Sequence, residues 1–326
     1  MRAVIAAQSW PRPEAGVLPL EATVRIVRDA WSAASSRVAL TVIGTPGGGP
    51  RTADALAGET WPVGGATARR AGGVVVLAPV AGPRWEPGAL SAALLGLAAA
   101  GETARVVVPL GDEPPAGDAA DLWGGGLEAS RAGVAALDIV ALVGSDRPLL
   151  GFTGMSAAVR DGREHDAALA QAAQAQEERW AAIAREADPV ASRRALLGPT
   201  RLSDEPGTGA AGGLAYTLAA MGARLMPAAP AVAELVGFDA AAVDADLVVA
   251  VVDTLAARDL DHGVTSAASV LAARRGVPCV VVTAHLAVGR RDLMVAGVAA
   301  AHEAAPGEAS LADQIRRVAQ TWTPDR

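Results

Sequence analysis

Short apolar runs recur along this chain, and stretches with helical spacing lie between them. The runs are rich in valine and show little polar alternation, a pattern typical of parallel strands that are buried on both faces. Their alternation with helices predicts an α/β fold with right-handed crossover connections. The expected strands are Ala3–Ala7, Val38–Ile43, Gly73–Leu77, Arg105–Val108, Ile139–Val143, Leu247–Val252 and Pro278–Thr283.

The spacing of apolar residues between these runs predicts the helices. Leu20, Val24, Val27 and Trp31 fall on one helical face. Glu164–Ala187 is rich in Gln, Ala and Glu, so it is either a solvated helix that bridges two lobes or an ordinary surface helix. Further helices are expected at Pro87–Ala100, Ala210–Gly222, Thr265–Arg275 and Leu311–Gln320, and loops at Gly111–Asp121 and Gly198–Gly209.

The chain contains no lysine, so all 28 of its Lys+Arg residues are arginine. This absence excludes a Walker P-loop, a pyridoxal-phosphate enzyme and the protein-kinase strand lysine, because each of these needs a lysine side chain. The motifs G-x-S-x-G, H-E-x-x-H and C-x-x-C are also missing. A net charge of −7 argues against a nucleic-acid partner, since phosphate binding needs concentrated positive charge.

Length and cysteine usage bound the domain number and the compartment. A chain of 326 residues is expected to form two domains or one large α/β unit. The single Cys279 cannot form an internal disulfide, which favours a reducing cytosol. No apolar stretch reaches the ~18–20 residues of a membrane span, and the apolar start is too short for a signal peptide. A cytoplasmic protein without a membrane partner is expected, and the sequence leaves its oligomeric state open.

Two glycine-rich segments are candidates for anion binding. Gly47, Gly48 and Gly49 follow an expected strand and precede a helical pattern, where backbone N–H groups and the helix dipole favour an anion. The alternative for this segment is a flexible turn. The second segment is Gly207–Leu214, in which Gly212 and Gly213 open an expected helix. A glycine in a helix destabilises it by about 0.5–1 kcal/mol relative to alanine. The two glycines are therefore explained either by close packing or by the close approach of a ligand.

A third loop, Asp253–His262, follows the expected strand Leu247–Val252. Ligands of open α/β sheets bind beyond the carboxyl ends of the strands, so a site is expected here. Asp259, Asp261 and His262 offer ligands for a hard metal ion or a magnesium–nucleotide complex. The alternative is a solvated acidic loop.

These loops resemble one family, the bacterial type I glycerate kinases, which phosphorylate glycerate with ATP and Mg²⁺. The likeness is clearest from Gly207 to Val282. The start of the chain, from Val4 to Trp10, resembles the family's V-I-A-P-D-S-F-K and places Ser9 on its serine. Gly47–Leu56 resembles the family's D-G-G-E-G-T-x-D-A-L and keeps Gly48, Gly49 and Thr52. Asp146–Gly151 resembles its D-N-P-L-x-G. The other matching segments are Gly207–Leu214, Met221–Leu225, Ala245–Val249 and Gly276–Pro278.

The sequence departs from the family at ionisable positions. The family's lysine positions fall on Pro11 and Gly263, and the acidic residue of its first motif falls on Gln8. The family's G-E-G-R-x-D-x-Q motif falls on residues 251–258. Its glycine-rich G-G-S-A-T-N-D-G-G loop is replaced by Gly111–Ala120, in which only Asp118 can take the place of the family's acidic residue. Phosphoryl transfer depends on positioning and on neutralised charge, so these losses remove part of the catalytic apparatus. The chain also lacks asparagine, so a coding bias is the alternative to loss of function as the reason for the missing lysines.

The resemblance implies an architecture of two α/β domains. A Rossmann-like parallel-sheet lobe would comprise residues 1–60 and 240–326, and a second α/β domain, residues 61–239, would be inserted into it. The resemblance also places the site between the two domains.

Two functions follow from the resemblance. The first is an ATP- and Mg²⁺-dependent kinase of glycerate or a related small hydroxy acid. In it Asp253, Arg258 and Asp259 are catalytic, and Asp259 and Asp261 hold the metal. The anion-binding set is Ser9, Gly47, Gly48, Gly49, Thr52, Gly207, Gly209, Gly212 and Gly213. The second function is a pseudoenzyme without a cofactor that binds a small anion or a protein partner.

Overall fold

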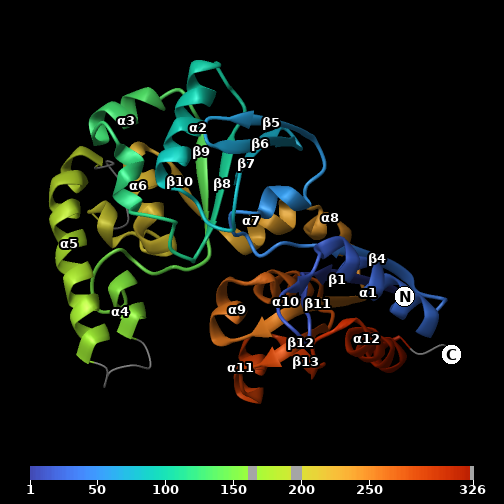
Figure 1. Ribbon diagram of the computed structural model, residues 1–326. Coiled ribbons are helices and arrows are strands. Elements are labelled where there is room, and N and C mark those ends of the chain that lie inside the picture. Colours follow the sequence, from blue (N-terminus) through green and yellow to red (C-terminus); the bar gives the residue numbers. More distant parts are fainter. Residues whose placement is uncertain (161–166, 192–199, 324–326) are drawn as a thin grey trace. The chain divides into compact units, whose positions relative to one another are not determined.

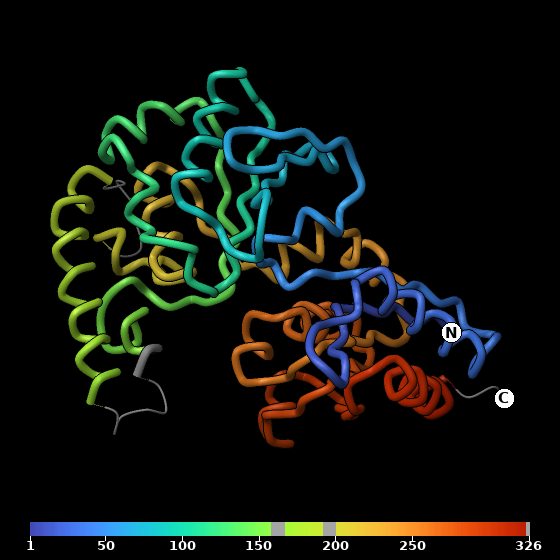
Figure 2. Tube along the Cα trace, viewed as in Figure 1, coloured from blue at the N-terminus to red at the C-terminus, as the bar shows by residue number. Residues whose placement is uncertain are grey.

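The computed structural model describes residues 1–160, 167–191 and 200–323. It divides into two compact units. Unit 1 combines Met1–Gly47 with Ala229–Arg326, and unit 2 is the intervening segment Gly48–Ala228. In Figure 2, unit 1 therefore contains both the blue beginning and the red end of the trace. The boundaries expected from the sequence lie near residues 60 and 240, whereas this division assigns residues 48–60 to unit 2 and residues 229–239 to unit 1.

Unit 1 is built on a five-stranded sheet with the order β13-β12-β11-β1-β4 (Figure 1). All four strand pairings are parallel. Its strands are β1 (Arg2–Ala7), β4 (Ala39–Gly44), β11 (Leu247–Leu255), β12 (Cys279–Leu286) and β13 (Val298–Glu303). A two-stranded antiparallel ribbon, β2 (Trp10–Pro11) with β3 (Val17–Leu18), lies between β1 and the first helix in the sequence.

Helices cover both faces of this sheet. Successive side chains of β1 point to opposite sides and therefore pack against different helices. Ala3, Ile5 and Ala7 pack with α1 (Leu20–Ala34) and α12 (Glu308–Trp322). Val4 and Ala6 pack on the other face with α8 (Phe238–Ala242) and α10 (Val264–Arg275). The predicted apolar stripe of the first helix is confirmed, since Val27 and Trp31 are fully buried.

Unit 2 contains a six-stranded mixed sheet with the order β10-β9-β8-β7-β6-β5. The four strands from β7 to β10 are parallel, whereas β5 and β6 add an antiparallel hairpin. The strands are β5 (Glu59–Val63), β6 (Ala66–Ala71), β7 (Val74–Pro79), β8 (Val106–Gly111), β9 (Ile139–Val143) and β10 (Arg224–Pro227). The predicted α/β class with two α/β bodies is therefore confirmed.

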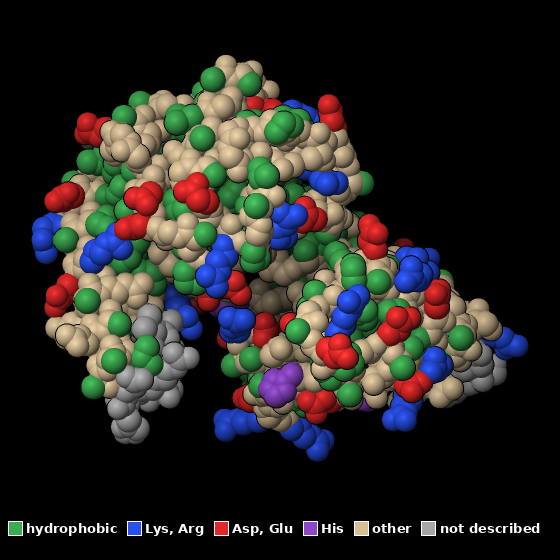
Figure 3. Space-filling model, in the orientation of Figure 1, with side chains coloured by type: hydrophobic (Ala, Val, Ile, Leu, Met, Phe, Trp, Pro, Cys, Tyr) green, Lys and Arg blue, Asp and Glu red, His purple; other side chains and the backbone are tan. Residues whose placement is uncertain are grey.

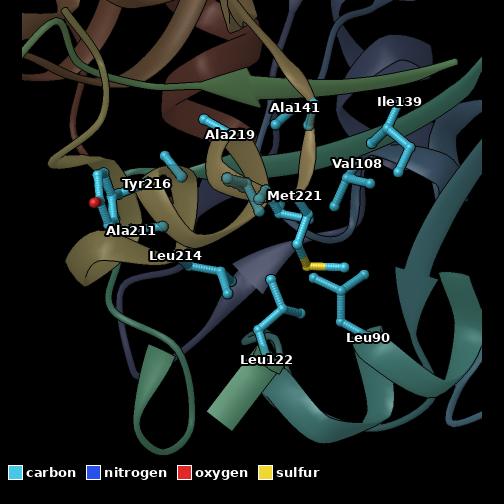
Figure 4. Packing of buried hydrophobic residues seen from close by; sticks show 14 of the residues in the cluster. Leu90, Val108, Leu122, Ile139, Ala141, Ala211, Leu214, Tyr216, Ala219 and Met221 are labelled. Atoms are coloured by element: carbon cyan, nitrogen blue, oxygen red, sulfur yellow. The ribbon is translucent and has the colours of Figure 1, made fainter. Parts of the chain in front are cut away.

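The core of unit 2 forms where helices meet the parallel strands. In Figure 4, Leu90 of α2 (Pro87–Ala99), Leu122 of η2 (Ala119–Trp123) and Met221 of α6 (Leu214–Met221) point toward one another. The other helical segments of the chain are η1 (Thr52–Ala55), α3 (Leu127–Gly133), α4 (Met155–Arg160), α5 (Ala167–Ala191), η3 (Leu202–Asp204), η4 (Ala210–Gly213), α7 (Ala228–Leu235), α9 (Ala257–His262) and α11 (Arg290–Val295).

Two helix predictions differ from the structure. The helix expected at Ala210–Gly222 starts only at Leu214, because Ala211, Gly212 and Gly213 have positive φ angles of 50°, 62° and 89°. Of the helix expected at Glu164–Ala187, residues 164–166 lie outside the described residues, and α5 continues to Ala191. Among the described helices, none is both long and apolar enough to cross a bilayer.

Candidate functional site

The carboxyl edge of the unit 1 sheet contains three of the predicted site residues. Ser9 follows β1, Gly47 follows β4, and Asp253 lies near the end of β11. The connection from β1 to β4 runs through α1 on one face of the sheet, and the connection from β11 to β12 runs through α10 on the other. This reversal between neighbouring strands is the topological switch point at which open α/β sheets bind ligands.

The backbone at this switch point is fixed by hydrogen bonds between strands. The N–H of Gln8 donates to the Val251 carbonyl at 2.8 Å, and the N–H of Thr45 donates to the Ala7 carbonyl at 2.8 Å. Asp253 is exposed, and its carboxylate accepts a 2.7 Å bond from the N–H of Thr254. A Cβ on Gly47 would lie 3.1 Å from the Gln8 side-chain nitrogen, so the two segments are adjacent.

Arg258, Asp259 and Asp261 all lie on the six-residue helix α9. Arg258 and Asp261 are exposed. Asp259 is the third residue of this helix, and its carboxylate accepts a 2.9 Å hydrogen bond from the N–H of Ala256, the N-cap residue, as in one half of a capping box. Within the described residues, no group of three or more Asp, Glu, His or Cys side chains is arranged to hold a metal ion.

We expect Asp259→Ala to lower the free energy of unfolding by about 1 kcal/mol, the usual net value of one lost hydrogen bond. Urea denaturation followed by circular dichroism measures this change. Asp261→Ala is the matched control, because Asp261 is an exposed side chain on the same helix, and its effect is expected to stay below about 0.5 kcal/mol. Equal stability of both variants would show that the cap contributes nothing.

In unit 2, the segment with Gly48, Gly49 and Thr52 lies at the carboxyl end of β8. The N–H of Gly111 donates to the Gly48 carbonyl at 3.1 Å, and a Cβ on Gly111 would lie 3.1 Å from the Gly49 Cα. Gly48 itself has a φ of 80°. The Thr52 hydroxyl is buried and donates to the Gly49 carbonyl at 2.7 Å. Thr52 therefore stabilises the turn that presents the two glycines.

The glycines of the second predicted segment pack closely against protein atoms. A Cβ on Gly207 would lie 3.0 Å from Val143 of β9, and one on Gly209 would lie 2.4 Å from the Pro148 carbonyl oxygen. Corresponding positions on Gly212 and Gly213 would lie 3.1 Å from Pro114 and 2.6 Å from the Trp180 ring. Close packing thus accounts for all four glycines, and the segment lies at the same carboxyl edge as Gly48 and Gly49.

A buried carboxyl group that sequence analysis missed holds this segment in place. Asp188, near the end of α5, accepts hydrogen bonds from the Tyr216 hydroxyl at 2.8 Å and the Ser203 hydroxyl at 2.6 Å. The Ser203 N–H also donates to it, at 3.2 Å. Burial, followed by the bond to Asp188, raises the pKa of Tyr216 far above its ordinary value. The phenol therefore remains a donor at all physiological pH values.

Three further polar residues were missed at the carboxyl edge of unit 2. Asp112 directly follows β8, and Ser145 and Arg147 follow β9. The Ser145 hydroxyl donates to the Asp112 carboxylate at 2.9 Å. Their position within four residues of the ends of two predicted strands was a usable signal, but sequence alone did not show that β8 and β9 are neighbours.

Asp118, which the family resemblance aligns with the acidic residue of the glycine-rich loop, is paired with an arginine and a backbone N–H. Its carboxylate bonds to the Arg179 guanidinium, which lowers the pKa of Asp118, and it accepts a 3.0 Å bond from the Ala120 N–H. Asp118 therefore stabilises the start of η2.

Two further observations concern the predicted partners and the cysteine. On the face shown in Figure 3, acidic and basic side chains are interspersed. Cys279 is fully buried in unit 1, and burial raises the pKa of its thiol to about 12. A thiol with this pKa is inert as a nucleophile at neutral pH.

Comparison with known proteins gives matches in both sequence and structure. The model of the Glycerate kinase family matches residues 117–323. Uncharacterised proteins from Mycobacterium bovis and Mycobacterium tuberculosis are each 31% identical over 212 residues, which is 64% of this chain and 52% of theirs. This chain spans about half the length of these curated relatives.

The structural match concerns the fold. A crystal structure from Salmonella typhimurium, of a protein provisionally named glycerate kinase 2, superposes with a TM-score of 0.61. The alignment covers 98% of this chain and 96% of that one, at 18% sequence identity. At this identity the match establishes a shared α/β architecture.

Proposed function

This chain belongs to the glycerate kinase family, and from that premise we propose that it transfers a phosphoryl group from ATP to glycerate or a related small hydroxy acid. The observation that carries the proposal is the placement of Ser9, Gly47 and Asp253 at the switch point of the parallel sheet in unit 1. Backbone N–H groups there would bind the anionic groups of the substrates.

The proposal gives each side chain a role that its geometry allows. Exposed Asp253 would accept the proton of the substrate hydroxyl, and Arg258 would bind a phosphate through its forked guanidinium. Asp259 would position Arg258 by fixing the start of α9. Asp261 is the remaining carboxylate on this helix for Mg²⁺, which when bound would neutralise phosphate charge.

A specific observation favours a second function, that of a pseudoenzyme binding a small anion or a protein partner without turnover. The two lysine positions of the family resemblance fall on Pro11 and Gly263, neither of which has a cationic side chain. One lost electrostatic donor typically removes about 2.7–4 kcal/mol of transition-state stabilisation.

The deciding experiment measures binding and turnover in parallel. Calorimetry with ATP and Mg²⁺ reports binding, and glycerate-dependent release of ADP reports turnover. Binding with turnover supports the kinase, and binding alone supports the pseudoenzyme. Background values in both measurements would overturn the kinase proposal.

We expect Asp253→Asn to reduce glycerate-dependent ADP release about 100-fold, because a neutral amide does not accept the hydroxyl proton. Asp246→Asn is the matched control. Asp246 directly precedes β11, at the opposite end of the strand that carries Asp253, and its carboxylate accepts a 2.7 Å bond from the Arg2 N–H. Its turnover is expected to change less than about twofold, since it lies at the amino edge of the sheet. Undiminished turnover in Asp253→Asn would remove Asp253 from the catalytic set.

A further inference from the structure

Among the described residues, no side chain caps the start of α10, the helix that leads from β11 to β12 in unit 1. Its N-cap residue is Gly263, which has no side chain to accept a hydrogen bond from the first turn. The first N–H groups of a helix have no partner within the helix, so they need an acceptor from elsewhere. The positive end of the helix dipole also favours a negative charge at this position.

A buried hydroxyl at the same helix start makes no hydrogen bond either. Thr265 is the second residue of α10 and is fully buried. Within the part of the chain that the structure describes, its Oγ1 has no partner. Because the Cα–Cβ bonds of a helix tilt toward its N-terminus, this hydroxyl lies at the same end as the first N–H groups. Buried polar groups of native proteins are nearly always hydrogen-bonded, so this hydroxyl indicates a ligand.

The charges at this helix start leave its donors available to an anion. The first turn of α10 contains no acidic residue, whereas the first turns of α1 and α12 contain Glu21 and Glu308. The nearest carboxylates in the sequence are those of Asp259 and Asp261. Asp259 is held by the Ala256 N–H at the other end of α9, and Asp261 is exposed. The first turn of α10 therefore has no carboxylate of its own beside its donors.

The donors lie close to the surface on a fixed part of the chain. Gly263 and Ser266, on either side of the buried Val264 and Thr265, are half-buried. The Ser266 hydroxyl donates to the Asp261 carbonyl at 3.0 Å and so ties the end of α9 to the start of α10. The position is also the one at which open α/β sheets bind ligands, beyond the carboxyl end of a strand.

We propose that the start of α10 binds a phosphate group. The N–H groups of Val264, Thr265 and Ser266 donate to its oxygens, and the Thr265 hydroxyl is an additional donor beside them. A phosphate suits this set better than a carboxylate, because a phosphate ester offers three acceptor oxygens and a charge of about −1.5 to −2. Only the source of the phosphate, a nucleotide, rests on the proposed function, since the site itself lies within unit 1.

Amide NMR of the full chain tests the site directly, with inorganic phosphate, ADP and adenosine as probes. We expect phosphate and ADP to shift the amide signals of residues 264–266, and adenosine, which has no phosphate, to leave them unchanged. Saturation at a lower concentration of ADP than of phosphate assigns the site to a nucleotide, and equal concentrations assign it to a free phosphate. The amides of residues 308–310 are the internal control, because no described side chain caps the start of α12 and Glu308 lies in its first turn.

Thr265→Val replaces the hydroxyl by a methyl group of similar size. We expect it to weaken phosphate binding about tenfold, in line with one lost hydrogen bond to a charged group. Its melting temperature without phosphate is expected not to fall, because the hydroxyl has no partner among the described residues. Thr265→Ser keeps the hydroxyl and is expected to bind phosphate as the native protein does. A lower melting temperature with unchanged phosphate binding would show a structural role and overturn the inference.

The outcomes separate this inference from the proposed kinase. Phosphate-dependent shifts at residues 264–266 that Thr265→Val weakens support the inference, even where no ADP is released from ATP. The absence of such shifts, or equal shifts at residues 308–310, would overturn it. Glycerate-dependent ADP release by a native protein without shifts at residues 264–266 would overturn the inference and leave the kinase intact.

Discussion

Asp188→Ala is expected to lower the free energy of unfolding of unit 2 by about 3 kcal/mol or more. The substitution removes the acceptor of three hydrogen bonds and leaves the Tyr216 hydroxyl and the Ser203 N–H unpaired in the interior. Each unsatisfied buried polar group costs about 1–3 kcal/mol. Tyr216 is fully buried and Ser203 is 1% exposed, so water has little access to either. Urea denaturation of the full chain, followed by tryptophan fluorescence, measures the loss.

Two further variants make this prediction specific to the hydrogen bonds. Asp204→Ala removes a carboxylate next to Ser203 that pairs with Arg201 on the surface, and it is expected to cost less than about 1 kcal/mol. Asp188→Asn keeps an acceptor for Tyr216 and is expected to cost less than the alanine variant. Equal effects of Asp188→Ala and Asp204→Ala would contradict the assigned role.

A double-mutant cycle with Tyr216→Phe isolates the Asp188–Tyr216 bond. We expect the double variant to be more stable than the sum of the single effects predicts, because the Tyr216 hydroxyl that Asp188→Ala leaves unpaired is absent from the double variant. Additive effects would show that the two groups act independently.

The predictable part of the fold comprises strands buried on both faces. Val248–Val251 and Val280–Val282 are unbroken apolar runs, and the burial of β11 and β12 explains why such runs signalled strands. The hairpin β5–β6 was missed because it lies at the edge of its sheet and contains no unbroken apolar run. In β6, buried Ala68 alternates with half-exposed Arg69. The alanine-rich edge strand β13 has few β-branched residues to signal it.

The site was less predictable, because its residues come from strands whose neighbours are set by topology. Ser9, Gly47 and Asp253 are far apart in the sequence, and only the strand order β11-β1-β4 brings their segments to one edge. Asp112 and Arg147 depend in the same way on β8 lying beside β9. Asp188 carried no signal at all, since its burial follows from how α5 packs on α6 through Trp180 and Tyr216.

Gly213→Ala is the second variant expected to have a large effect, a loss of about 3 kcal/mol in the free energy of unfolding. Gly213 has a φ of 89°, which L-residues adopt at an expense of about 1–3 kcal/mol. The new methyl group would also lie 2.6 Å from the ring of Trp180, which is 2% exposed and so has little room to move. Overpacking of this kind costs about 1–3 kcal/mol. Thermal and urea unfolding both report the change.

Gly222→Ala is the matched control, because Gly222 lies at the other end of α6 and also has a positive φ, 113°. A Cβ there would meet no atom within 4 Å, so only the positive φ would destabilise the alanine variant. We therefore expect Gly213→Ala to be the more destabilising of the two, and the difference between them measures the contact with Trp180. Because Gly213 closes the segment that begins at Gly207, the same clash would also displace backbone N–H groups at the carboxyl edge of unit 2. An equal loss of stability in both variants would show that the Trp180 ring yields to the methyl group and that the left-handed backbone alone explains the glycine.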